Sequence, residues 1–254
     1  KMVRDFVAKE ITPYAKDWDK EEKFPWDVWR KMGQVGIIGT AIPEEYGGGG
    51  MDNITHAIVA EEIGYGCSSL RGTYSVQVSL VAKTIMAFGT EEQKQKYLPG
   101  MATGELIGCY GLTEPDSGSD AASMTSTAEQ DGDYYILNGN KMWITNAGIA
   151  DVALVFAKTD KNAGARGITA FLVDKDTPGY STQDIHEKLG LKASNTAEII
   201  LDNVRVPKEN ILGEIGRGFR VALAALDNGR YTVAAGCVGA AQAALDTAKQ
   251  YAKD

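Results

Sequence analysis

The chain has 254 residues, 44% hydrophobic and 24% charged, and this composition is typical of a globular protein with a core large enough to fold unaided. Its formal net charge of −8 argues against nucleic acid or an anionic membrane as the main partner. No apolar run approaches the roughly 20 residues that a membrane-spanning helix requires.

Residues 1–108 are predicted to form a helical domain. Apolar residues recur at helical spacing near the start, and further helices are expected over residues 25–35, 54–63 and 74–88. The sequence Thr90-Glu91-Glu92-Gln93 has the form of a capping box, which predicts a helix start there. The apolar residues of the first helix, which Pro13 interrupts, are Met2, Val3, Phe6, Val7 and Ile11.

Residues 109–213 are predicted to form a β-domain. Short β-rich runs occupy residues 134–137, 152–156, 168–173 and 198–201. Turn sequences separate them, among them Asp131-Gly132-Asp133 and Asn138-Gly139-Asn140, both expected to be turns. Short strands with no helices between them favour an antiparallel barrel or sandwich.

Residues 214–254 are predicted to form one or two helices. Alanine-rich helices of this kind normally pack inside a bundle. We therefore expect the chain to contain only the first helices of a C-terminal bundle, in an α+β protein whose N-terminal domain is all helical. A polypeptide of residues 1–254 alone is expected to associate, because the bundle face near Val221–Leu245 is left uncovered.

Familiar site signatures are missing. The sequence has no G-x-G-x-x-G after a strand, no phosphate-binding G-x-x-x-x-G-K-[ST] and no G-x-S-x-G elbow. His56 and His186 have no matching ligand set, so no metal site is expected. The three cysteines, at positions 67, 109 and 237, are expected to be reduced and buried, which suits a cytoplasmic or matrix compartment.

Two segments carry possible chemistry. The loop Cys109–Asp120 combines hydroxyl groups with Pro115 and Gly118, so it either wraps a polar ring and a phosphate or is a hydrophilic turn. In the segment Asn138–Asn146, Trp143 can stack beside a flavin ring and Thr145 can donate to it, although a tryptophan in a strand is more often part of a core.

Together these segments resemble the acyl-CoA dehydrogenase family. The stretch G-L-T-E-P-x-S-G-S-D matches one family signature, and N-G-x-K-x-W-I-T-N follows at the usual interval. The resemblance spans the chain and includes Ile42–Gly48, Gly89–Pro99, Val206–Gly213 and Leu226–Arg230. It implies FAD as cofactor and a fold of an N-terminal helical domain, a middle β-barrel and a C-terminal four-helix bundle.

The resemblance also assigns site residues by motif position. The residues expected to bind FAD are Tyr110, Leu112, Thr113, Gly118, Ser119, Trp143, Ile144 and Thr145. The residues expected to bind the acyl-CoA are Arg71, Ser119, Leu226, Asp227 and Arg230. Asp227 and Arg230 are alternatively a surface ion pair at i,i+3. No catalytic base is assigned, because the family's usual glutamate is expected beyond residue 254.

Arg71 decides the expected substrate. Its surroundings resemble those of glutaryl-CoA dehydrogenases, in which an arginine at this position pairs with the distal carboxylate; the alternative is an ordinary exposed arginine. Decarboxylating members carry a glutamate at the position of Gly64, so the resemblance leaves decarboxylation in doubt.

The resemblance thus predicts α,β-dehydrogenation of a short-chain acyl-CoA, with glutaryl-CoA favoured. Electrons are expected to pass to an electron-transfer flavoprotein, and the subunits to form a homotetramer in the bacterial cytoplasm or the mitochondrial matrix. Four alternatives stay open: a butyryl-CoA or alicyclic acyl-CoA dehydrogenase, an acyl-CoA oxidase, a nitroalkane oxidase, and a truncated fragment that binds flavin or CoA without catalysis.

Overall fold

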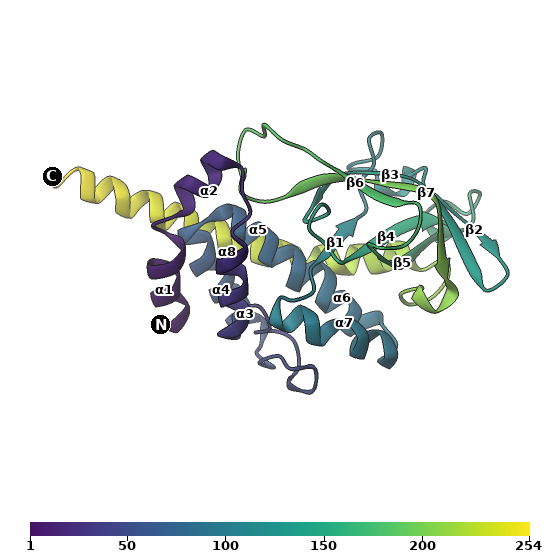
Figure 1. Ribbon diagram of the computed structural model, residues 1–254, viewed down its shortest axis with the longest axis horizontal. Coiled ribbons are helices and arrows are strands. Elements are labelled where there is room, and N and C mark those ends of the chain that lie inside the picture. Colours follow the sequence, from purple (N-terminus) through teal and green to yellow (C-terminus); the bar gives the residue numbers. More distant parts are fainter.

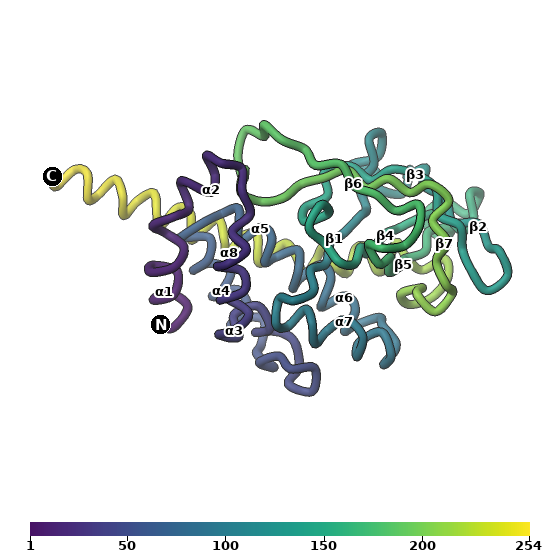
Figure 2. The backbone as a smooth tube through the Cα atoms, viewed as in Figure 1, coloured from purple at the N-terminus to yellow at the C-terminus, as the bar shows by residue number.

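The computed structural model describes all 254 residues, Lys1–Asp254. A group of helices lies beside a curled β-sheet, and one long helix runs along both (Figure 1). The predicted fold class is therefore confirmed. The chain trace places both termini at the helical end of the molecule, remote from the sheet (Figure 2).

The helical part follows the apolar periodicity of the sequence. The predicted helix over 25–35 is α3, that over 54–63 is α4, and the one predicted from 74 begins earlier, at Ser68. Helix α2 was not predicted, because it buries none of its residues and so lacks an apolar stripe. The elements are α1 (Met2–Phe6), a π-helical turn (Val7–Ile11), α2 (Ala15–Glu21), α3 (Trp26–Gln34), a 3-10 turn (Glu44–Tyr46), α4 (Asn53–Gly66), α5 (Ser68–Ser75), a π-helical segment (Val76–Ala82), α6 (Lys83–Phe88) and α7 (Glu91–Thr103).

The predicted capping box is confirmed at the start of α7. The Thr90 hydroxyl accepts a hydrogen bond from the Gln93 N–H at 3.3 Å, and the Gln93 side chain accepts one from the Thr90 N–H at 3.1 Å. Two of the free N–H groups at this helix end are thereby satisfied.

The sheet has seven strands in the order β1-β4-β2-β3-β7-β6, and β5, outside this order, pairs with β4. Four pairings are antiparallel, as predicted, but β4 runs parallel to β1 and to β2. Strands β1, β2 and β4 therefore point in the same direction. Strand β3, which lies between β2 and β4 in the sequence, runs in the opposite direction and brings the chain back. The strands are β1 (Gly108–Gly111), β2 (Thr127–Asp131), β3 (Tyr134–Thr145), β4 (Val152–Lys158), β5 (Ile168–Asp174), β6 (Tyr180–Asp184) and β7 (Thr196–Pro207).

One predicted turn is confirmed and the other is wrong. Asp131-Gly132-Asp133 joins β2 to β3, with Gly132 at φ +60°. Asn138-Gly139-Asn140 instead lies inside the continuous strand β3, where the register with β7 shifts at a bulge. Gly139 is needed there because its φ is +144° and an added Cβ would lie 2.2 Å from the Ser126 hydroxyl oxygen.

Sheet and helices share a hydrophobic core. Leu154 and Phe156 of β4 belong to the same buried cluster as Val81 of the helical part. Val221 and Ala222 of the last helix, α8 (Gly218–Tyr251), join this cluster. The segment predicted as one or two helices is thus a single helix of 34 residues, anchored at its first turns against the sheet.

Farther along, α8 packs closely on α4. An added Cβ at Gly239 would lie 2.0 Å from the Glu61 carbonyl oxygen, and one at Gly64 would lie 2.5 Å from the Gly236 carbonyl oxygen. Contacts this short exclude a side chain unless the helices separate. The crossing of α4 and α8 therefore depends on glycine.

The cysteine prediction is partly wrong. All three cysteines are free, and Cys67 and Cys109 are buried, but Cys237 is exposed on α8. None of the helices combines the length and apolarity that crossing a bilayer requires.

Replacing Gly64 by alanine is expected to lower the free energy of unfolding by about 1–3 kcal/mol, because the new methyl group collides with the α8 backbone. Denaturant titration measures the change. Gly190→Ala is the control, since a Cβ added there meets no atom within 4 Å, and we expect it to stay within about 0.5 kcal/mol of the parent. Equal stabilities of the two variants would contradict the tight crossing.

Candidate functional site

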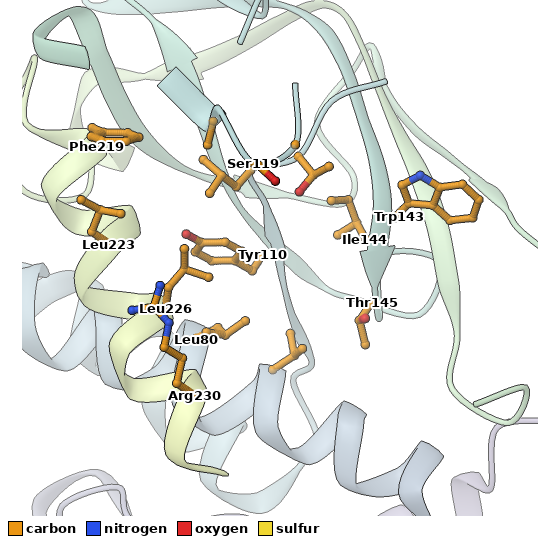
Figure 3. Close-up of a pocket in the computed structure, with 15 residues that line it drawn as sticks. Leu80, Tyr110, Ser119, Trp143, Ile144, Thr145, Phe219, Leu223, Leu226 and Arg230 are labelled. Carbon is orange, nitrogen blue, oxygen red and sulfur yellow. The ribbon is translucent and has the colours of Figure 1, made fainter. Parts of the chain in front are cut away.

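A cavity of about 420 Å³ opens where the loop after β1, the end of β3 and the start of α8 meet (Figure 3). Ten of its 15 lining residues are hydrophobic, so it offers an apolar volume with a few polar groups at defined places. Its lining residues are Val76, Leu80, Tyr110, Leu112, Thr113, Gly118, Ser119, Ala121, Trp143, Ile144, Thr145, Phe219, Leu223, Leu226 and Arg230.

Tyr110 ties the loop to α8. Its ring lies edge-on to that of Phe156, with 5.1 Å between the centroids, and its hydroxyl donates to the Ala222 carbonyl oxygen at 3.0 Å. Burial raises the pKa of this phenol above its usual range. The hydroxyl is therefore engaged within the chain, and Tyr110 presents only its ring to the cavity.

The edge of β3 is shaped by a second bulge. The register with β7 shifts between Lys141 and Ile144, and Trp143 adopts a left-handed conformation at φ +62°. Such a backbone is strained for a residue other than glycine. Ile144 is buried, whereas Trp143 is 61% exposed and lies at the outer edge of the site (Figure 3). The bulge thus allows three consecutive side chains, residues 143–145, to border one cavity.

A buried ion pair joins the loop to this strand. The Lys141 Nζ lies 2.8 Å from the Glu114 Oε1, and both side chains are almost fully buried. Glu114 also accepts hydrogen bonds from the Thr125 N–H and hydroxyl and from the Ser126 N–H. Burial alone would raise the pKa of Glu114, but attraction to Lys141 and these hydrogen bonds outweigh it and hold the pKa at about 2.

A second cavity, of about 300 Å³, shares Val76, Leu80 and Thr145 with the first and extends toward Arg71. The Arg71 Nε is buried without a hydrogen-bond partner, as is the hydroxyl of Ser75. Burial lowers the pKa of Arg71. A half-buried guanidinium whose Nε has no partner is costly, so this cavity has the chemistry to receive a carboxylate.

Glycine makes room for this arginine. An added Cβ at Gly236 of α8 would lie 2.5 Å from the Arg71 Cδ and 2.7 Å from its Nε. The arginine side chain therefore runs across the α8 backbone at a point where any other residue would displace it. The interpretation of Arg71 as an ordinary exposed arginine is wrong.

The outer side of the first cavity carries an exposed ion pair. The Arg230 Nη1 lies 2.5 Å from the Asp227 Oδ1, and both side chains are 72% exposed. Exposed pairs contribute little stability. Either partner is therefore free to exchange this contact for one with a ligand.

Known proteins match this chain along its whole length. Models of the acyl-CoA dehydrogenase N-terminal, middle and C-terminal domains match residues 1–105, 109–204 and 216–254. The glutaryl-CoA dehydrogenase of Desulfococcus multivorans is 49% identical over 258 residues, which cover 100% of this chain and 66% of that protein.

Two solved structures have the same fold as this chain. A glutaryl-coenzyme A dehydrogenase in complex with glutaryl-CoA has a TM-score of 0.96 and 50% identity, over 99% of this chain and 64% of that one. A glutaryl-CoA dehydrogenase from Mycobacterium smegmatis in complex with FADH2 has a TM-score of 0.91 and 41% identity, over 98% and 63%.

The chain belongs to the acyl-CoA dehydrogenase family. It spans about two thirds of the length of its relatives, 66% in the case of the Desulfococcus protein. The resemblance inferred from the sequence motifs is therefore confirmed.

Acyl-CoA dehydrogenases are FAD enzymes, and the residues of the first cavity fit that cofactor. Its apolar walls suit a flat aromatic ring. The hydroxyls of Thr113, Ser119 and Thr145 border it and make no hydrogen bond within the chain. At Gly118 an added Cβ meets no atom within 4 Å, so the loop backbone is open to a phosphate.

The structure brings all eight predicted FAD residues together in this cavity. Of the predicted acyl-CoA residues, Ser119, Leu226 and Arg230 line the same cavity, and Arg71 lines its neighbour. Asp227 lines neither and is seen only in its pair with Arg230.

Several residues that line the two cavities were not predicted from the sequence. Val76, Leu80, Phe219 and Leu223 line the first cavity as unremarkable helical apolar residues, and nothing local distinguishes them from core. Ser75 was also missed, although it stands four residues after Arg71, on the same face of a helix.

Glu114 is expected to make stability depend on pH between about 4.5 and 2. Because its folded-state pKa of about 2 lies below the ordinary 4.5, the carboxylate stabilises the fold above pH 4.5, and this contribution is lost as the pH falls through 2. Denaturant titrations across this range should show the stability gap between the parent and Glu114→Gln narrowing toward low pH. A constant gap would contradict the assignment.

Proposed function

We propose that the full-length protein is an FAD-dependent dehydrogenase that forms a double bond between the α and β carbons of a short acyl-CoA bearing a distal carboxylate. Glutaryl-CoA is the substrate that fits best. The observation that carries the proposal is the half-buried Arg71, whose Nε has no partner, in a cavity that shares Val76, Leu80 and Thr145 with the cofactor cavity.

The roles of the cavity residues follow from their chemistry. Thr113 and Thr145 offer hydroxyl donors to the flavin ring, while Gly118 and Ser119 offer the loop backbone and a hydroxyl to the pyrophosphate. The remaining FAD contacts are assigned to the apolar and aromatic walls of the same cavity, namely Tyr110, Leu112, Trp143 and Ile144.

Leu226, Asp227 and Arg230 are assigned to the acyl-CoA, with Ser119 near its CoA arm. Leu226 and Arg230 line the cofactor cavity from the first turns of α8, and Asp227 is held beside Arg230. A thioester entering past this exposed pair would reach the apolar part of the cavity before the second cavity.

The proposed reaction divides its tasks between the cofactor and the chain. When bound, FAD supplies a hydride acceptor for the β-carbon. Arg71 and Ser75 hold the distal carboxylate, which fixes the position of the acyl chain along the shared wall of Val76, Leu80 and Thr145. The apolar lining excludes water from the reacting carbons. The proton acceptor for the α-carbon is expected outside residues 1–254.

We further propose that oxidation is not followed by decarboxylation. The glutamate of decarboxylating relatives would stand at Gly64, where an added Cβ lies 2.5 Å from the Gly236 carbonyl oxygen. A side chain there would require α4 and α8 to separate. This proposal predicts an unsaturated dicarboxylic thioester as the product.

The family resemblance also supports an electron-transfer flavoprotein as electron acceptor and a homotetramer as the assembly. Three free cysteines suit a compartment that keeps thiols reduced, such as the bacterial cytoplasm or the mitochondrial matrix.

The full-length protein is expected to be purified with FAD and to oxidise glutaryl-CoA with a higher kcat/KM than butyryl-CoA or an alicyclic acyl-CoA. Dye-coupled assays with a thioester panel measure this ratio, and mass spectrometry of the product reports whether carbon dioxide is lost. Preference for butyryl-CoA would overturn the dicarboxylate assignment. Rapid reoxidation of the reduced enzyme by air would favour an oxidase.

Arg71→Ala should lower kcat/KM for glutaryl-CoA by about 30-fold or more, because losing one partner of a buried charge pair costs at least about 2 kcal/mol. Activity with butyryl-CoA, which has no distal charge, should change far less. Arg30→Ala, on the exposed side of α3, is the control. Equal losses of kcat/KM with the two substrates would show that Arg71 does not bind the distal carboxylate.

A further inference from the structure

The Lys141–Glu114 pair lies directly behind the part of the loop that faces the cofactor cavity. The Lys141 Nζ, besides its contact with Glu114, lies 3.4 Å from the carbonyl oxygen of Leu112. The lysine stem passes Gly111, where an added Cβ would lie 3.4 Å from the Lys141 Cγ. The ammonium group thus reaches the loop from inside the sheet, on the side away from solvent.

The Leu112 carbonyl belongs to the same peptide unit as the Thr113 N–H. The chain has no cis peptide bonds, so this N–H points to the side opposite the carbonyl oxygen. Thr113 lines the cofactor cavity, and its N–H donates to no acceptor within the chain. A cation at the oxygen end of a peptide makes its N–H a stronger donor, because the peptide dipole is polarised further.

A second contact fixes the next peptide along the loop, between Thr113 and Glu114. The Met142 N–H donates to the Thr113 carbonyl oxygen at 2.9 Å. Residues 112 and 113 are therefore held by two neighbouring residues of β3. Since β3 also carries Trp143, Ile144 and Thr145, the two walls of the cavity are joined at one place.

Stability alone is a weak reason for this pair. Replacing a buried ion pair by apolar residues is often neutral or stabilising, because two charges must be removed from water. Lys141 is fully buried, and its only other neighbour within hydrogen-bonding range is the Met124 sulfur at 4.0 Å. If the Lys141 ammonium group polarises the Thr113 N–H, its charge has a role that an apolar side chain such as methionine could not perform.

We propose that Lys141, oriented by Glu114, is a positioning residue that fixes and polarises the Leu112–Thr113 peptide, so that the Thr113 N–H becomes a strengthened hydrogen-bond donor to the flavin ring. This inference rests on the proposed function of the cavity as an FAD site. A stronger donor favours reduced FAD over oxidised FAD, because the reduced ring carries more negative charge. Lys141 therefore raises the reduction potential of the bound cofactor.

The test compares the full-length holoenzyme with the double variant Glu114→Gln/Lys141→Met, which removes both charges together. The control is Asp133→Asn/Lys208→Met, which removes an exposed pair in the same domain. We measure the midpoint potential of the bound flavin, its absorbance spectrum, the Kd for oxidised FAD and the thermal unfolding of the apoprotein.

In the double variant the preference for reduced over oxidised FAD should fall about tenfold, which for a two-electron couple lowers the midpoint potential by about 30 mV. The flavin absorbance should shift with it, and the control should match the parent. A folded double variant with the potential and spectrum of the parent would overturn the inference.

If the double variant does not fold, Glu114→Gln alone is measured. This variant keeps the ammonium group at Leu112 without its counter-charge, so the potential should rise above that of the parent, and an unchanged or lower value would overturn the inference. If neither variant folds while the control does, the pair is structural and the inference fails. If the parent itself binds no FAD, the proposed function fails instead.

Discussion

A buried contact between an ammonium group and a carboxylate joins two segments that are 27 residues apart in the chain. Around it lie the loop after β1 and the bulged end of β3, which form two walls of the first cavity. Without Lys141 and Glu114, the loop would be attached there mainly by the Met142–Thr113 backbone hydrogen bond. The start of α8 forms a further wall of the cavity and packs against β4 through the core that they share.

A different constraint shapes the second cavity. Glycines let α4 and α8 pack with their backbones in contact, and one of them, Gly236, leaves the space through which Arg71 passes. The β-domain thus builds the part suited to a flat cofactor, and the helices build the part suited to a carboxylate. Thr145 borders both cavities, so a ligand that fills the second cavity ends beside the first.

Much of the fold could be predicted from local patterns. The capping box at Thr90, the apolar strands β4 and β5 and the turn at Gly132 each have a physical signal within a few residues. Strand β6 lacked one, since it is mostly exposed and polar. The Asn138-Gly139-Asn140 sequence led to a wrong prediction because a glycine with positive φ occurs in a bulge as well as in a turn. The deciding neighbour, Ser126, lies just before β2, distant in the sequence.

For the site, the loop and strand motifs identified eight of the 15 residues that line the first cavity. The sequence did not reveal that Arg71 lies in a separate cavity, because that depends on how α5 meets α8. The sequence also did not reveal the ion pair between Glu114 and Lys141. Each charge alone resembles a surface residue, and only the folded chain shows that both are buried.

A crystal structure of the full-length protein with FAD and glutaryl-CoA tests the central claim most directly. The account predicts the flavin ring between Thr113 and Thr145, the pyrophosphate at Gly118 and Ser119, and the distal carboxylate of the substrate on Arg71. A flavin bound elsewhere, or a carboxylate that leaves Arg71 unpaired, would contradict it.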